Sequence, residues 1–400
     1  MRAWLTWIAA GVVGACYSPR PTADCQVLCS AADGDSCPDG FACGASGLCS
    51  VGGNACPGDP GGPQVCFGEG IAKPCVPAVP AGQVMLSGTI NTDADTRCVV
   101  IAQRPGEPQL CVIGGQEIAI GKPVHAVGTR PLVLVATETI TVTAMLDARS
   151  VRGEPVTGAG AIPCPAPLSV GEAGIGAGGV GGSFGGGGGT GAAGSGVPAT
   201  APTQPIPFPD HVRGGCPGGA GAEGTSAVVG KPGGGGGALY LIAKRQIDVQ
   251  AVIAANGAGA LLDLPEIGAR AGGGGGGGGS GGLIVLEAPV VTFGGEARVL
   301  AMGGGGAGGG GTVASQAGGD SNPAASLPVS MLTAPGGLGG ISNGGKGGNG
   351  SSMTSLDGAD GVEGTSEGGG GGGGGGAGYI KLMCTMCSTG SAVIIPVPVS

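Results

Sequence analysis

Cysteines have the greatest capacity for chemistry in this chain, and their spacing separates them into groups. Eight of the 15 cysteines lie between residues 25 and 75, and Cys384-Thr-Met-Cys387 forms a C-x-x-C motif. A zinc site would need a second cysteine pair nearby, and a thioredoxin-like redox site would need a βαβ unit, and neither is evident. We therefore expect structural disulfides between the remaining neighbours: Cys98 with Cys111, Cys164 with Cys216, and Cys384 with Cys387.

Groups for acid–base chemistry are few. The only histidines are His125 and His211. Two histidines leave little scope for a catalytic zinc site or a Ser-His-Asp type catalytic triad. The repeat alignment below stacks Asp147 on His125, the best pair for general acid–base work, although such a contact is more often a solvated pair. A loop carries charges that we interpret as solvated: Asp263, Glu266 and Arg270. We predict no catalytic residue, no metal ligand, no cofactor and a protein that is not an enzyme.

The first residues have the pattern of an export signal. Met1-Arg2 precedes an apolar run to Ala15 that is too short to span a membrane. The run ends Val13-Gly14-Ala15-Cys16, which resembles the lipobox of bacterial lipoproteins. The resemblance implies cleavage after residue 15, lipidation of Cys16, and a place in the bacterial envelope at the outer membrane or cell surface. The alternative is an ordinary secretory signal with Cys16 in a disulfide.

Composition excludes several functional classes. Gly 98 and Pro 31 together mark low complexity, whereas charged residues make up only 11% of the chain. The net charge of −9, with scattered Lys and Arg, argues against a nucleic-acid partner. Fourteen cysteines remain after Cys16, an even number that favours disulfides in an exported protein.

A small module is expected after the lipidated tether of residues 16–24. Residues 25–76 contain eight cysteines and too few apolar side chains for a core, so disulfides must stabilise them. The stretch from Cys37 through Cys43 to Cys49 resembles half of an EGF-like module. Eight cysteines allow 105 pairings, and spacing does not choose among them.

A repeat of about 22 residues begins near residue 82, and each copy holds three short alternating apolar runs. Its proposed inward rows are Leu110/Leu132/Leu239/Leu283, Ile118/Ile140/Ile247/Val291 and Ile120/Val142/Val249/Phe293, with a truncated copy from Tyr379. A unit of this size with three strands is typical of one β-helix coil. The chain thus resembles right-handed parallel β-helix proteins of the pectin-lyase type, and we predict that all-β fold for residues 82–400. The alternative is a β-sandwich.

Long glycine-rich insertions interrupt the repeat at residues 153–236, 265–282 and 303–376. Since glycine loses the most conformational entropy on ordering, we expect these insertions to be mobile or loosely laid over the coils. The first strand of each copy also has apolar residues at its outward positions: Val133, Val135, Tyr240, Ile242, Ile284 and Leu286. Such a strand must be covered, either by the chain's own insertions or by a partner.

The leading functional hypothesis is a lipid-anchored, non-enzymatic surface protein for adhesion or envelope structure. The chain resembles glycine-rich surface lipoproteins of myxobacterial type, and its glycine runs resemble the repeats of PE-PGRS proteins without their helical domain. This implies the membrane as one partner, through the lipid, and an extracellular glycan or surface protein as another. The alternatives are a polysaccharide-binding or polysaccharide-cleaving β-helix, and a mostly disordered chain.

Overall fold

The computed structural model divides the chain into two units, residues 1–64 and 65–400. It describes residues 29, 37–43, 49–51, 64–77, 79–154, 157–161, 164, 171–172, 175–194, 199–202, 204–224, 230–262, 272–311, 316–320, 328, 331–341 and 343–399. The signal segment and Cys16 therefore lie outside the described residues, as do Asp263, Glu266 and Arg270.

The first unit contains one antiparallel hairpin, β1 (Phe41–Cys43) with β2 (Cys49–Val51). Disulfides join Cys29 to Cys43 and Cys37 to Cys49, so both strands are anchored covalently. The boundary at 64/65 is earlier than the one expected at residue 76. The hairpin of β3 (Val65–Cys66) and β4 (Cys75–Val76), closed by the Cys66–Cys75 disulfide, consequently belongs to the second unit.

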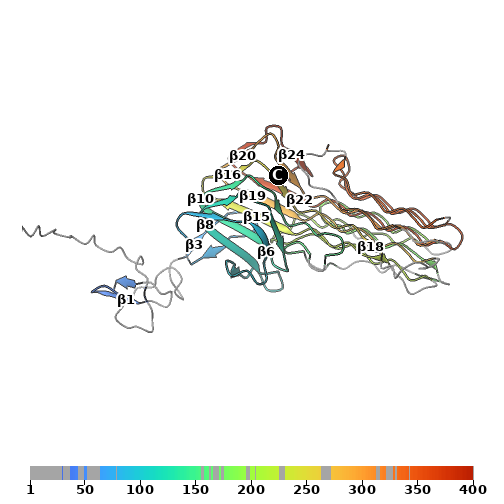
Figure 1. Ribbon diagram of the computed structural model, residues 1–400, viewed down its shortest axis with the longest axis horizontal. Helices are drawn as coiled ribbons and strands as arrows, with labels where there is room; N and C mark the ends of the chain where they lie inside the picture. The colour runs from blue at the N-terminus through green and yellow to red at the C-terminus, as the bar shows by residue number, and fades with distance from the viewer. Residues whose placement is uncertain are drawn as a thin grey trace, which may run out of the picture. The chain divides into compact units, whose positions relative to one another are not determined.

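Two sheets dominate the second unit, and we refer to them together as the strand wall (Figure 1). The ten-stranded sheet contains β5 (Gln83–Met85), β7 (Val99–Ile101), β8 (Leu110–Ile120), β10 (Leu132–Val142), β15 (Ala238–Ala243), β16 (Gln246–Val249), β19 (Leu283–Glu287), β20 (Val290–Phe293), β22 (Tyr379–Met383) and β23 (Met386–Ser388). The six-stranded sheet contains β6 (Gly88–Asn91), β9 (Val124–Val127), β11 (Leu146–Asp147), β17 (Val252–Ala254), β21 (Arg298–Leu300) and β24 (Val393–Ile395). Two short pairs lie apart: β12 (Gly171–Glu172) with β13 (Ile175–Gly176), and β14 (Gly230–Lys231) with β18 (Leu261–Leu262). Apart from β7 with β8, neighbours in the strand wall are parallel.

The predicted right-handed parallel β-helix is wrong. The parallel strands form an almost closed, barrel-like wall of two sheets around one main core, not three-sided coils. In β8 and β10 the chain continues as one strand of 11 residues where the repeat predicted two strands and a corner. The sequence Ala136-Thr137-Glu138-Thr139 contains no Gly or Pro to break β10, and only an irregularity in register interrupts its pairing there.

The inward rows were predicted correctly for the second strand of each copy. Ile140 pairs with Ile118 and Ile247, and Val142 pairs with Ile120 and Val249. These side chains belong to the main core, together with Leu132, Leu146 and Ile253. Alternation of β-branched and polar residues with period two is enough to specify this face.

The first row was wrong by one residue at two of its positions. Leu132 pairs with Cys111 rather than Leu110, because β10 has an extra residue between Ala136 and Thr139 relative to β8. Leu239 likewise pairs with Ile284 rather than Leu283. A slip of one residue exchanges the two faces of a strand, so Ile284 and Leu286 point into the main core instead of outward.

The chain itself covers the outward apolar face of the first strands. Val133, Val135, Tyr240 and Ile242 form a second cluster that also includes Leu110, Val112, Ala238, Leu283 and Val285. Phe67 and Val76 from the β3–β4 hairpin and Phe184 and Val212 from the first insertion complete that cluster. Part of the cover thus comes from the insertion, as expected, and part from the hairpin.

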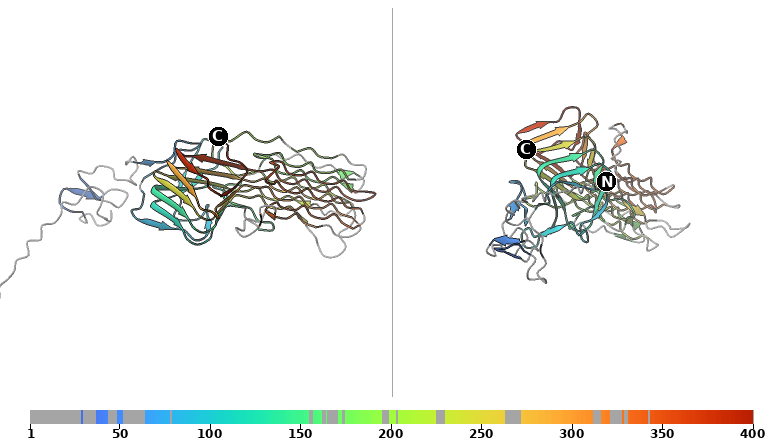
Figure 2. Two further views of the ribbon diagram at one scale, coloured as in Figure 1. Left: turned by 90° about the horizontal axis from the view of Figure 1, so that it is seen from above. Right: turned by 60° about the vertical axis from the view of Figure 1, so that its left-hand side comes forward.

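The described parts of the glycine-rich segments are ordered, which contradicts the expected mobility. We call them the glycine layer: residues 176–192, 214–222, 230–237, 255–260, 272–282, 301–311, 316–319, 334–341, 343–351 and 356–378. They run side by side as extended segments that are almost entirely outside the β-strands (Figures 1 and 2). Segment 272–282 illustrates the packing, because it exchanges backbone hydrogen bonds with six neighbouring segments. Its amides donate to 216–222, 255–258 and 370–376, and its carbonyls accept from 176–182, 230–236 and 304–310.

Bonds to any one neighbour recur every third residue, as in Gly275, Gly278 and Gly281, which donate to 370, 373 and 376. Three residues per turn is the geometry of the polyproline II helix, whose backbone groups all point outward and are available to neighbours. None of the glycines from 273 to 282 has a positive φ, so backbone freedom is not the reason for glycine. A Cβ on Gly278 would overlap the carbonyl oxygen of Gly304 and lie 2.6 Å from its carbonyl carbon.

The position of a segment in the glycine layer therefore follows from its glycine period. Segments with six neighbours, such as 272–282, are almost pure glycine. Segment 343–351 has four neighbouring segments and follows a Gly-Gly-x pattern, with Lys346 and Asn349 exposed at x. Segment 358–364 lies at a corner and follows Gly-x-x. A side chain is tolerated only where no neighbouring backbone approaches, as in the collagen triple helix.

Replacing a central glycine should destabilise the second unit strongly. We expect Gly278→Ala to lower the free energy of unfolding by about 3 kcal/mol, because the methyl group has no space. Thermal or urea unfolding measures the difference. The matched control is Gly121→Ala, where the nearest contact of the new Cβ would be Thr143 Oγ1 at 4.0 Å. It should change stability by less than about 1 kcal/mol; equal effects of the two substitutions would contradict the packing described here.

Candidate functional site

The acid–base pair expected from the repeat is formed. Asp147 on β11 pairs in register with His125 on β9, and its Oδ2 lies 3.2 Å from His125 Nδ1. Arg149 contacts the same carboxylate twice. Its Nε lies 2.9 Å from Oδ2, and its backbone amide donates a hydrogen bond to Oδ1 at 2.9 Å. The Asp147 side chain is 1% exposed. A buried carboxylate held between the Arg149 guanidinium and the His125 imidazole serves as an internal ion-pair acceptor, and its lone pairs face those partners.

Removal of this carboxylate should therefore lower the free energy of unfolding. Asp147→Ala leaves Arg149 without its counter-ion and His125 without its carboxylate partner, and we expect a loss of about 3–5 kcal/mol in unfolding free energy. The control is Glu138→Ala, which breaks an ion pair to Arg245 that is 73% exposed, at an expected cost below about 1 kcal/mol. Similar stabilities for the two variants would refute the structural role of Asp147.

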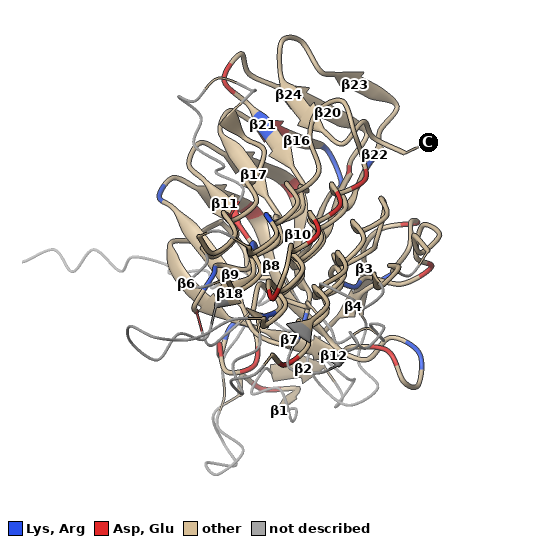
Figure 3. Ribbon diagram, turned by 90° about the vertical axis from the view of Figure 1, so that its right-hand side faces the viewer, with Lys and Arg blue, Asp and Glu red and all other residues tan. Residues whose placement is uncertain are grey.

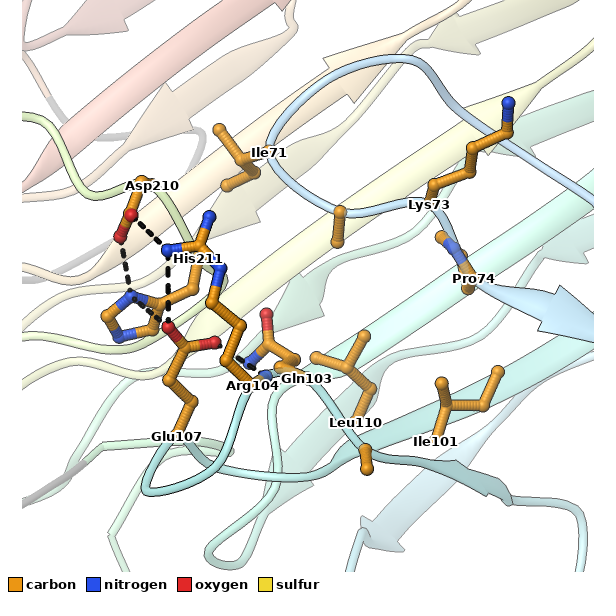
Figure 4. Close-up of a pocket in the computed structure, with 12 residues that line it drawn as sticks. Ile71, Lys73, Pro74, Ile101, Gln103, Arg104, Glu107, Leu110, Asp210 and His211 are labelled. Carbon is orange, nitrogen blue, oxygen red and sulfur yellow. Dashed lines mark hydrogen bonds and ion pairs between the residues drawn. The ribbon is translucent and has the colours of Figure 1, made fainter.

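A second cluster lines a small cavity of about 150 Å³ (Figure 4). His211 Nδ1 lies 3.0 Å from Asp210 Oδ1 and 3.4 Å from Glu107 Oε1, and the Arg104 guanidinium pairs with both carboxylates. Glu107 and His211 are mostly buried, whereas Asp210 and Arg104 are exposed. One imidazole and two carboxylates within 4.8 Å could ligate a metal ion, but Arg104 already neutralises those carboxylates.

The cluster joins two loops that are far apart in the sequence. Gln103 fixes the same junction, because its Nε2 donates to the carbonyls of Pro108 and Val212 and its Oε1 accepts from the Val212 amide at 2.8 Å. This arrangement holds the chain after residue 206 against the loop before β8, which completes the cover over the first strands. Sequence analysis missed the cluster, since the only signal was a histidine adjacent to an aspartate in a loop without repeats.

The hydrogen bond from His211 and then the Arg104 guanidinium lower the pKa of Asp210 from 3.8 to about 2. A depressed carboxyl pKa stabilises the folded state above pH 4, and that contribution disappears as the pH falls towards 2. We expect Asp210→Asn to lower the melting temperature slightly at pH 5 and to match the unmodified protein near pH 2. Because Asp210 is exposed, 1 M salt should shrink the difference at pH 5. A difference that grows on acidification would contradict this assignment.

A hollow of about 870 Å³ lies at the carboxyl ends of the adjacent parallel strands β15, β19 and β22. Its lining comes from the ends of those strands and from the β3–β4 hairpin. Tyr240 donates a short hydrogen bond to Glu287 Oε2, and the Glu69 amide donates to Glu287 Oε1 at 2.6 Å. Burial, followed by the bond to Glu287, raises the pKa of Tyr240 well above its ordinary value. Tyr240 is consequently a neutral hydrogen-bond donor at any physiological pH.

The glycine layer presents a side-chain-bearing surface, which we call the outer face, on segments 334–341, 343–351 and 356–363. These segments are hydrogen-bonded neighbours: Gly347 and Gly350 donate to 337 and 334, and Ala359 and Val362 donate to 349 and 346. Their exposed apolar side chains include Leu338 (53% exposed), Ile341 (65%), Leu356 (51%) and Val362 (53%). Charged residues are interspersed along the described chain, as Figure 3 shows.

The structure contains the disulfides Cys98–Cys111, Cys164–Cys216 and Cys384–Cys387, the three pairings expected from sequence. Cys111 and Cys216 are buried, and the Arg213 guanidinium donates to Cys164 Sγ at 2.8 Å. Among the described residues, no helix has the length and apolar character needed to cross a bilayer. Comparison of the chain with protein-family models, curated proteins and solved structures gave no match.

Proposed function

We propose that this chain is a lipid-anchored, non-enzymatic protein of the bacterial envelope that uses the glycine layer to present a rigid binding surface for adhesion. The observation that carries the proposal is the outer face. Three adjacent segments there display side chains at fixed intervals on a backbone that its neighbours hold in place.

Rigidity supports a binding role. Segment 368–378, like segment 272–282, is hydrogen-bonded on all sides, and segments 343–351 and 358–364 attach directly to it. A surface that is already ordered loses little conformational entropy when it binds, so weak contacts at many repeated positions suffice. Leu338, Ile341, Leu356 and Val362 supply the apolar area that contact surfaces commonly have.

The state of the ionisable groups supports a non-enzymatic role. Asp147 is engaged by His125 and Arg149, and Glu287 is engaged by Tyr240 and the Glu69 amide. Glu107 and Asp210 are engaged by His211 and Arg104. The carboxylates in these three clusters hold parts of the chain together, which leaves them poorly placed to exchange protons with a substrate.

Two features support export and anchoring. Disulfides form and persist in oxidising compartments, and the described residues contain six. The sequence Val13-Gly14-Ala15-Cys16 provides the acceptor for the lipid. Cells fed an alkyne-labelled fatty acid should label the full chain, and Cys16→Ser should abolish the label; labelling that persists in the variant would exclude this anchor.

The soluble Cys16→Ser form allows a direct test of binding. It should bind a subset of glycans on an array, or a protein on intact cells, and the double variant Leu338→Ser/Ile341→Ser should lose most of that binding because it removes apolar contact area. The control is Val397→Ser, a 79% exposed side chain outside the glycine layer. Binding that survives the double variant would exclude the outer face, and glycan cleavage would exclude the non-enzymatic role.

A further inference from the structure

Two disulfides reach the hollow at the ends of β15, β19 and β22. Cys66 of the Cys66–Cys75 disulfide and Cys384 of the Cys384–Cys387 disulfide both line it. The hollow is large enough for a peptide side chain and its neighbours, and Phe67, Pro289 and Met383 give it apolar walls. This combination places reducible sulfur beside space for a partner.

The disulfides of the second unit differ in access to solvent. Cys111 is fully buried and Cys216 is 4% exposed, whereas their partners Cys98 and Cys164 are half-buried, so neither of these disulfides has an exposed cysteine. Cys387 is exposed, and Met386 beside it is 62% exposed. Cys384 is half-buried and packs against the main core. Exposed disulfides exchange more readily than buried ones, because a thiolate must approach one sulfur along the bond axis.

Two cations line the hollow together with Cys384. Lys73 and Lys244 line it, and Lys244 Nζ lies 5.0 Å from the centre of the Phe67 ring. The carboxylates of the same lining are Glu69 and Glu287, and Glu287 is engaged by Tyr240 and the Glu69 amide. Cations near a sulfur stabilise its thiolate and make it a better leaving group.

We propose that Cys384–Cys387 is a thiol–disulfide exchange site that accepts two electrons from a dithiol on a partner protein or peptide. A partner thiolate attacks Cys387 Sγ, which breaks the Cys384–Cys387 bond and releases Cys384 as a thiolate towards the hollow. The second partner thiolate attacks the partner sulfur of the mixed disulfide and releases Cys387. The partner ends as a disulfide, and Cys384 and Cys387 end as thiols after taking up the two protons.

Exchange here changes the structure only locally. The disulfide closes the turn between β22 and β23, while β22 remains paired with β19 and β23 with β20. The C-terminal residues also stay attached, because the Val399 amide donates to the Ile380 carbonyl at 2.8 Å. The folded chain can therefore pass between the disulfide and dithiol forms without loss of the strand wall.

Graded reduction tests the proposal on the folded protein. The soluble Cys16→Ser form is incubated with increasing dithiothreitol, newly formed thiols are alkylated, and peptide mapping locates them. Cys384 and Cys387 should be alkylated at the lowest reductant concentration, with Cys98–Cys111 and Cys164–Cys216 still intact in the same molecules. If Cys384–Cys387 opens no earlier than these buried disulfides, or if only Cys66–Cys75 opens early, the proposal is overturned.

A second measurement tests the direction of attack and the role of the cations. With a synthetic peptide carrying two thiols, acid quenching should trap the mixed disulfide on Cys387 rather than Cys384. Lys244→Met and Lys73→Met should slow exchange several-fold, and the control Lys346→Met, on the outer face, should leave it unchanged. Trapping on Cys384, or equal rates in all three variants, would overturn the mechanism.

Discussion

Contact between backbones without intervening side chains is the constraint on which the second unit depends. In the glycine layer each segment approaches its neighbours so closely that a Cβ at Gly278 would overlap the carbonyl of Gly304. The backbone hydrogen bonds formed in this way offset the large entropy that glycine loses on ordering. Because hydrogen bonds on all sides replace a conventional apolar interior, the glycine layer needs almost no large side chains.

The strand wall and the glycine layer are continuous along the chain, because glycine segments lead directly into or out of the β-strands. Segments 230–237, 272–282 and 368–378 run directly into β15, β19 and β22, and segments 255–260 and 301–311 continue from β17 and β21. Register in one part therefore determines register in the other: Gly278 and Gly281 donate to 373 and 376, and Leu283 pairs with Tyr379 a few residues later. Packing of Phe184 and Phe208 edge-on against Tyr379 closes the junction.

Prediction from sequence succeeded where the alternation of apolar residues alone determines which face of a strand is buried. It failed where close contact between backbone segments determines the structure. The row of Ile118, Ile140 and Ile247 followed from alternation, and the contact of Asp147 with His125 followed from that row. A bulge in β10 shifted Leu132 relative to Leu110, and no composition rule anticipates such an extra residue. Glycine was interpreted as flexible, although the period of three in Gly-Gly-Leu338-Gly-Gly-Ile341 was visible. The Glu107–His211 contact joins distant loops without repeats, so no pattern could reveal it.

The Gly-Gly-x segments have a consequence for how such a protein diversifies. At Leu338 and Lys346 the side chain is exposed to solvent, so natural variants can accept almost any residue type there without refolding the scaffold. At the two glycines of a triplet such as Gly347 and Gly348, by contrast, a Cβ would overlap a neighbouring carbonyl oxygen, so substitution there is strongly destabilising. Selection can thus alter recognition one position at a time, on a frame that stays invariant, much as loops vary on an immunoglobulin sandwich.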